Sequence, residues 1–203
     1  MGQVRDQAMI EFWYDFASPY ACIAAERIMR LPPPQRDRFR WRPFLLGGVF
    51  AHHAPDAGGR QQMGVAARAN KWRDLERLFA EHDIGWFGEG LRTYPPDSLR
   101  ALRMALVMDD QPGFALRVFR AAFADDQDIA DPAVLESLAG ETGHSLRTVS
   151  ETPEVKFRLR SNGNDAIAAG IFGAPSFLVG GELFFGQDRL DQALRWSADF
   201  HST

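Results

Sequence analysis

The chain changes from a strand pattern to a helix pattern across Ser18-Pro19, and this junction limits the folds open to it. An alternating apolar run predicts a strand over 9–15, and a helical pattern follows over 19–30. Ser18 suits the N-cap position, and Pro19 suits the first helical position, where a missing N–H costs nothing. The junction places a hydroxyl and free backbone donors at the positive end of a helix, which suits an anion such as a thiolate. The alternative is that Ser18 only caps the helix.

The next elements follow from patterning. A second strand is predicted over 38–45, where side chains alternate before Gly47-Gly48. Residues 51–62 have the composition of a loop. From about residue 63 to 150 apolar residues recur at helical spacing, with breaks, so we expect a block of several helices.

The sequence pattern changes again over the last fifty residues. A helix is predicted to about residue 169, followed by two short strands around Gly180-Gly181, a typical hairpin turn signal. An amphipathic helix over 189–196 comes last. The order is therefore β-α-β, a helical block, then α-β-β-α. This order predicts an α/β fold in which a small mixed sheet is flanked by helices and interrupted by a helical insertion.

Composition excludes several function classes. The net charge is −4 and arginines are interleaved with acids, so no basic stripe favours nucleic acid. No apolar run approaches the about 20 residues that span a bilayer, and no signal-peptide core is present, so we expect a cytoplasmic protein without a membrane partner. The single cysteine, Cys22, allows no internal disulfide and is expected to be a small buried apolar residue. His52 and His53 are interpreted as loop residues, and no metal site is expected.

Two further motifs have residues that suit ligand binding. Pro175 follows Gly-Ala at the start of a predicted strand, where a cis peptide bond would turn the Ala174 backbone toward a peptide-like ligand. A plain loop that enters an edge strand is the alternative, and spacing leaves both open. Gln187 and Asp188 begin the last helix. Free N–H groups there suit a carboxylate and Asp188 suits an ammonium group, whereas the alternative is a helix cap.

Together these motifs resemble the 2-hydroxychromene-2-carboxylate isomerase family, which is related to kappa-class glutathione transferases and to the DsbA-like thioredoxin fold. The resemblance covers nearly the whole chain, and the order of the motifs makes it specific. The matching stretches are Ser18-Pro19-Tyr20, Trp41-Arg42-Pro43-Phe44-Leu45-Leu46-Gly47-Gly48-Val49-Phe50, Arg73-Asp74-Leu75-Glu76-Arg77, Gly170-Ile171-Phe172-Gly173-Ala174-Pro175-Ser176-Phe177 and Phe185-Gly186-Gln187-Asp188-Arg189-Leu190.

The resemblance implies a thioredoxin-like domain of the DsbA and kappa-class type, formed by 1–50 and 151–203 and interrupted by an all-helical domain over 51–150. Glutathione is expected to bind between them, and the family resemblance suggests a homodimer. Ser18 stands where the dithiol relatives carry the first cysteine of Cys-x-x-Cys. Both sulfur positions are replaced here, so disulfide exchange by the usual route is not available.

The resemblance also implies residue roles. Ser18 would donate a hydrogen bond to the glutathione sulfur, and the helix N-terminus would favour the thiolate. Ala174 and Pro175 would pair with the glutathione backbone, while Gln187 and Asp188 would hold its γ-glutamyl end. The expected reaction is reversible addition of the thiolate to an activated alkene of an aromatic ketoacid, bond rotation and release of the thiolate, without redox change.

The second substrate is expected to be a small aromatic or hydrophobic molecule whose carboxylate and oxyanion need a cation. Arg42, Arg68 and Lys71 are the candidates, and the sequence does not rank them.

Two departures from the family pattern keep other functions open. The place of a usual Asn reads His53-Ala54-Pro55, and that of a usual Lys falls near Ala67. The alternatives are a kappa-class-like glutathione transferase, which would use the same thiolate, and a non-catalytic thioredoxin-like binding protein. A disulfide oxidoreductase would depend on Cys22, and we expect no such activity.

Overall fold

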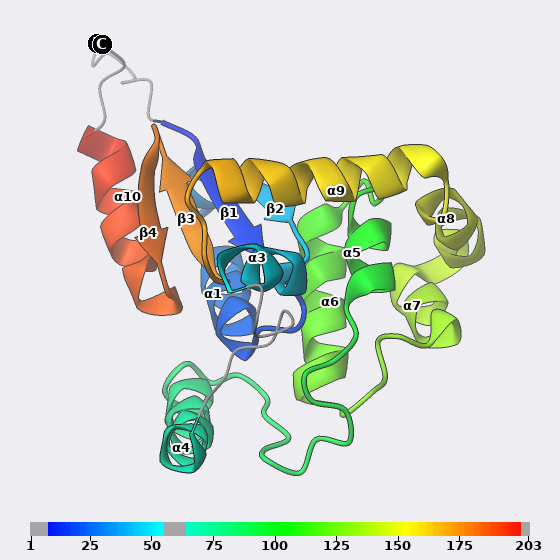
Figure 1. Ribbon diagram of the computed structural model, residues 1–203, viewed down its shortest axis with the longest axis horizontal. Helices are drawn as coiled ribbons and strands as arrows, with labels where there is room; N and C mark the ends of the chain where they lie inside the picture. Colours follow the sequence, from blue (N-terminus) through cyan, green and yellow to red (C-terminus); the bar gives the residue numbers. More distant parts are fainter. Residues whose placement is uncertain (1–7, 55–63, 200–203) are drawn as a thin grey trace.

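The computed structural model describes residues 8–54 and 64–199, and four strands of this part form one mixed sheet in the order β2-β1-β3-β4 (Figure 1). The strands are β1 (Ile10–Tyr14), β2 (Phe39–Pro43), β3 (Ser176–Val179) and β4 (Glu182–Phe185). β1 and β2 are parallel, with Phe12 opposite Trp41. β3 is antiparallel to both β1 and β4. The N-terminal β-α-β unit and the C-terminal hairpin therefore form one sheet, as the element order predicts.

Helices cover both faces of the sheet. One face is covered by α1 and α10, and the other by α3 and α9, which runs across the sheet in Figure 1. The bounds of these helices are α1 (Pro19–Met29), α3 (Leu46–His53), α9 (Pro153–Ala168) and α10 (Leu190–Asp199). Alternation along β1 explains this arrangement. Phe12 and Tyr14 belong to the hydrophobic core on the side of α1 and α10, and Trp13 belongs to the core on the side of α3 and α9.

The middle of the chain is helical, as its spacing predicts. Its helices are α4 (Val65–Glu81), α5 (Leu99–Ala105), α6 (Gln111–Phe123), α7 (Pro132–Ala139) and α8 (Gly143–Ser150), with the short η2 (Gly140–Thr142) between the last two. Two other short helices lie outside this block: α2 (Pro33–Arg36) precedes β2, and η3 (Gln187–Arg189) follows β4. The α6 residue Phe119 packs against Phe16 with ring centroids 4.9 Å apart. The architecture is α/β with a helical insertion, and the division at residues 50 and 151 stays a prediction.

The stretch after β2 differs from the sequence expectation. The strand ends at Pro43 rather than at residue 45, and a helix, α3, begins at Leu46. The carboxylate of Asp15 accepts a hydrogen bond from the Leu46 N–H at 2.7 Å, which satisfies one donor of the first turn. The interpretation of His52 and His53 as loop residues is wrong, since both lie in the last turn of α3. The rest of the predicted loop, from 55 to 62, lies outside the described residues.

The C-terminal hairpin predicted around Gly180-Gly181 is confirmed. Gly180 and Gly181 have φ angles of 57° and 90°, and β3 and β4 pair directly on either side of them. In the described part of the chain, helices are too short or too polar to cross a membrane.

Candidate functional site

Ser18 caps α1, as the sequence predicts. Its N–H donates to the Asp15 carbonyl at 3.0 Å, and its Oγ accepts from the Ala21 N–H at 3.3 Å. Pro19 occupies the first helical position. The N–H of Tyr20 has no acceptor among the described residues, so a donor remains at the positive end of this helix.

The Ser18 hydroxyl reaches the second predicted motif. It is buried and donates to the Ala174 carbonyl oxygen at 2.8 Å, across 156 residues of sequence. The peptide bond between Ala174 and Pro175 is cis. The structure therefore brings three of the predicted site residues together: Ser18, Ala174 and Pro175.

The third motif adjoins the same loop. Gly186, with φ of 109°, precedes η3, and its N–H donates to the Pro175 carbonyl at 3.0 Å. A side chain at Gly186 would be strained at this positive φ. Gln187 is buried, whereas Asp188 is largely exposed and its carboxylate lies 3.4 Å from Arg189. Gln187 and Asp188 thus begin a helical turn next to Pro175, as their spacing suggests.

Arg42 is engaged within the fold. Its Nη2 donates to Asp165 Oδ2 at 2.8 Å, and its guanidinium lies 4.5 Å from the Trp13 ring centroid. The charge of Arg42 is therefore already paired on the face of the sheet covered by α3 and α9.

Arg68 and Lys71 lie on α4, away from the sheet. Arg68 is exposed, and the Lys71 Nζ lies 5.2 Å from the Tyr94 ring centroid. Lys71 and Asp74 are three residues apart and so share one face of the helix. Asp74 accepts a hydrogen bond from the Tyr20 hydroxyl at 3.1 Å, which directs this face toward the start of α1.

Two groups at the site had no place in the sequence interpretation. Asp15 is fully buried and accepts from the N–H groups of Ala17 and Leu46; burial raises the pKa of its carboxyl. The sequence feature that could have indicated Asp15 is a carboxylate at the end of an apolar strand.

Tyr20 is the second of these groups. Burial and the Asp74 hydrogen bond raise the pKa of Tyr20 above its ordinary value, so this hydroxyl stays protonated. The Tyr20–Asp74 bond joins α1 to α4 and had no local signal.

Cys22 lies in the first turns of α1 and is buried, as expected. Burial raises the pKa of its thiol well above the ordinary value, and Glu26 adds to the rise. The thiolate needed for disulfide exchange is therefore suppressed. Within residues 8–54 and 64–199, no cluster of three potential metal-ligating side chains occurs.

Comparison with known proteins agrees with this geometry. The chain is 25% identical over 201 residues to glutathione S-transferase kappa 1 of Rattus norvegicus, covering 90% of this chain and 88% of the relative. It is 24% identical over 190 residues to 2-hydroxychromene-2-carboxylate isomerase of Sphingobium xenophagum, covering 90% and 94%. A solved structure of 2-hydroxychromene-2-carboxylate isomerase superposes with a TM-score of 0.75 at 20% identity, covering 96% of this chain and 100% of that one.

The family model of the DSBA-like thioredoxin domain matches residues 9–195, from the first strand of the sheet into the last helix. The fold described above is the DsbA-like thioredoxin fold with a helical insertion. This chain therefore belongs to the family of DSBA-like thioredoxin domains.

Proposed function

We propose that this protein is a glutathione-dependent isomerase that acts on an aromatic ketoacid, in the manner of 2-hydroxychromene-2-carboxylate isomerase. The observation that carries the proposal is Ser18 at the N-terminus of α1, with its Oγ 2.8 Å from the Ala174 carbonyl oxygen. A hydroxyl occupies the place of a redox thiol and Cys22 is buried. The reactive sulfur must therefore come from the ligand.

Several features support glutathione as that ligand. The Tyr20 N–H is an unoccupied donor at the positive end of α1, which suits a thiolate. The main chain of Ala174 lies against Ser18 at the same helix end, and its N–H, which has no acceptor among the described residues, can pair with a peptide. The exposed carboxylate of Asp188 suits the ammonium group of a γ-glutamyl end, and Gln187 lies next to it.

When bound, glutathione supplies the thiolate that forms and later breaks a carbon–sulfur bond with the substrate. The backbone donors of α1 stabilise the negative charge, and the Ala174-Pro175 backbone and η3 orient the peptide. Ser18 has one hydroxyl proton, which it donates to Ala174 here. To donate to sulfur, this hydroxyl must rotate away from the Ala174 oxygen, so the donors of α1 carry much of the thiolate stabilisation.

Lys71 and Arg68 are better placed than Arg42 to bind the substrate carboxylate. Lys71 shares the α4 face of Asp74, which bonds Tyr20 next to the thiol site, whereas Arg42 is paired with Asp165. Arg68 lies one turn before Lys71 on the same helix.

A kappa-class-like transferase is the second candidate. The relative named glutathione S-transferase kappa 1, which is 25% identical over 201 residues, supports this candidate. The site would use the same sulfur, and the reactions differ in whether that sulfur leaves again.

Titration calorimetry with glutathione tests the shared requirement. We expect binding in the micromolar to millimolar range. No heat at millimolar glutathione would reject both enzymes and leave a non-catalytic binding protein. If glutathione binds, turnover of 2-hydroxychromene-2-carboxylate without consumption of glutathione indicates the isomerase. Stoichiometric loss of glutathione to an aryl halide without such turnover indicates the transferase.

The Ser18→Ala variant tests the role of the hydroxyl. We expect the pKa of the bound thiol to rise by about one unit, equivalent to about 1.4 kcal/mol, seen as weaker thiolate absorbance at neutral pH. Ser176→Ala is the matched control, because its hydroxyl is also buried and donates to the same loop, at Gly173. An unchanged thiolate signal in Ser18→Ala would rule out the hydrogen bond to sulfur.

A further inference from the structure

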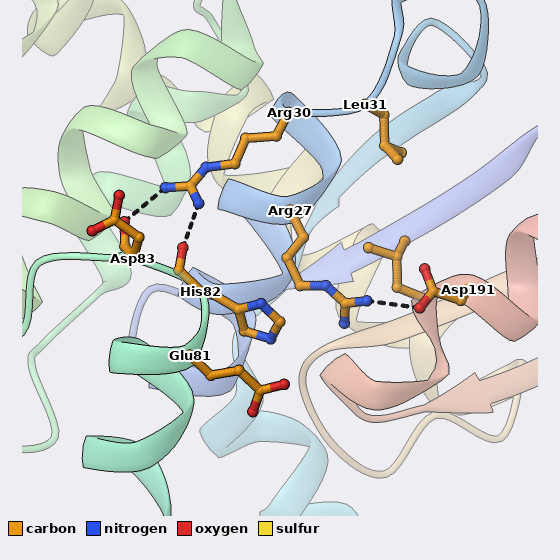
Figure 2. Close-up of a pocket in the computed structure, with 8 residues that line it drawn as sticks. Arg27, Arg30, Leu31, Glu81, His82, Asp83 and Asp191 are labelled. Atoms are coloured by element: carbon orange, nitrogen blue, oxygen red, sulfur yellow. Dashed lines mark hydrogen bonds and ion pairs between the residues drawn. The ribbon is translucent and has the colours of Figure 1, made fainter.

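Arg27 of α1 makes two hydrogen bonds to the η3 turn and a third to the first turn of α10. Its Nη1 donates to the Gln187 main-chain oxygen at 2.6 Å and to Gln187 Oε1 at 3.0 Å. Its Nη2 donates to Asp191 Oδ2 at 3.0 Å, which Figure 2 marks. The Arg27 side chain is only 18% exposed. A planar guanidinium with several fixed donors suits such a fork, whereas a lysine ammonium does not.

These bonds close a ring of contacts around the proposed glutathione site. α1 is joined to the Ala174-Pro175 loop by the Ser18 hydroxyl, and that loop is joined to η3 by the Gly186 N–H. Arg27 supplies the remaining link, from η3 back to α1. Each of the three segments is therefore bonded to the other two, and removing Arg27 opens the ring at Gln187.

The Arg27 bond also sets which way the Gln187 amide faces. Because Arg27 has only donors, the amide oxygen must point toward it, and the amide nitrogen must point away. That nitrogen has no acceptor among the described residues. Gln187 can therefore offer two N–H donors to a ligand carboxylate, beside the exposed carboxylate of Asp188.

Arg30 provides a natural comparison. It lies three residues farther along the chain, at the C-cap of α1, and both arginines line the same groove of about 430 Å³ (Figure 2). Arg30 donates to the main-chain oxygens of His82 and Asp83, at the end of α4, and makes no bond to η3. The two side chains thus share helix, charge and groove, and differ in the segment that they hold.

We propose that Arg27 is a positioning residue for the γ-glutamyl end of glutathione, acting by fixing the orientation of the Gln187 amide. The inference rests on the proposed function. In this proposal Arg27 acts through Gln187 and makes no contact of its own with the ligand. The ligand chemistry that it selects is an α-amino acid group, with carboxylate toward Gln187 and ammonium toward Asp188.

The test compares glutathione with cysteinylglycine, which lacks the γ-glutamyl group, by calorimetry on wild type, Arg27→Met and Arg30→Met. We expect Arg27→Met to weaken glutathione binding by about tenfold, the scale of a hydrogen bond to a charged group. Cysteinylglycine should bind wild type and Arg27→Met equally. Arg30→Met should leave both affinities unchanged, and the pKa of the bound thiol should not move in either variant.

Two outcomes would overturn the inference: unchanged glutathione affinity in Arg27→Met, or an equal loss for both ligands, which would indicate general disruption of the fold. If Arg27→Met does not fold, Arg27→Lys keeps the charge without the fork and should show a smaller loss of the same selectivity. A wild type that binds neither ligand would instead reject the proposed function, and the inference with it.

Discussion

At the residue scale, Asp15 holds together the turn that carries Ser18. Its Oδ1 accepts from the Ala17 N–H at 2.9 Å, and its Oδ2 accepts from the Leu46 N–H at 2.7 Å. One side chain therefore links the end of β1, the cap of α1 and the start of α3. Since both oxygens face backbone donors, an amide cannot replace this carboxylate without placing its nitrogen against an N–H.

We expect Asp15→Asn to lower the free energy of unfolding by about 1–3 kcal/mol, the cost of a buried donor left unpaired. Urea denaturation measures this. Asp128→Asn is the matched control, because Asp128 is exposed and its side chain accepts from a single N–H, that of Ala130, so an amide oxygen can replace it. A similar small loss in both variants would show that the two contacts of Asp15 carry little stability.

Asp15 also makes the stability of the fold depend on pH in a predictable direction. Burial raises the pKa of Asp15 above its ordinary value of 3.8, against the lowering effect of its hydrogen bonds. The folded state therefore holds this proton more tightly than the unfolded state, and the stability from Asp15 falls as pH rises above 3.8. Asparagine does not titrate. The stability difference between wild type and Asp15→Asn should shrink with rising pH, and a difference that grows would contradict the raised pKa.

At the element scale, local signals predicted most boundaries and failed at α3. The caps, prolines and hairpin glycines act on their own neighbours, so the sequence indicated α1, β3 and β4 well. The first turn of α3 depends on a carboxylate 31 residues earlier, at Asp15. The Gly47-Gly48 pair within it is a typical end signal, and a tertiary contact overrides that preference.

An ion pair between a buried glutamate of α1 and a half-exposed arginine of α6 joins these two helices. Arg120 donates from Nε and Nη2 to the two carboxylate oxygens of Glu26, at 2.6 and 3.0 Å, and the Glu26 side chain is 3% exposed. Arg30 approaches the same carboxylate only to 3.9 Å. Arg120→Met would therefore leave a buried charge with a weak partner.

We expect Arg120→Met to lower the free energy of unfolding, measured by urea denaturation, by about 2–4 kcal/mol. Adding Glu26→Gln to this variant should restore part of the loss. The surface pair of Arg73 with Glu76 gives the control, where Arg73→Met should cost less than about 1 kcal/mol. Equal losses at Arg120 and Arg73 would show that the α1–α6 pair is no more important than a surface pair.

At the scale of the whole molecule, what the sequence could not predict is which distant groups meet. Ser18, Ala174-Pro175 and Gln187 each carried a local signal, and the family resemblance joined them into one site. Arg27 carried none, because its partners lie 160 residues away and an arginine in a helix is usually a solvated side chain. Residues that position other residues are therefore visible only in the folded chain.

One hydrophobic core passes through both the sheet and the helical insertion. It contains Phe12 of β1, Ile23 of α1, Phe79 of α4, Phe119 of α6 and Leu135 of α7, all fully or almost fully buried. Side chains from the two predicted domains thus complete each other's packing. Because neither part can lose the other without exposing this surface, we expect the whole chain to unfold in one cooperative transition.

Hydrogen exchange followed by mass spectrometry across a urea series can test this cooperativity. Peptides from β1 and from α6 should lose protection at the same urea concentration. The Phe119→Leu variant, which trims the core on the helical side, should lower both midpoints together, by about 1–2 kcal/mol of stability. If the two parts were independent, this variant would shift the midpoint of α6 and leave that of β1 in place. A shift confined to α6 would contradict the shared core and favour a separately folding domain over 51–150.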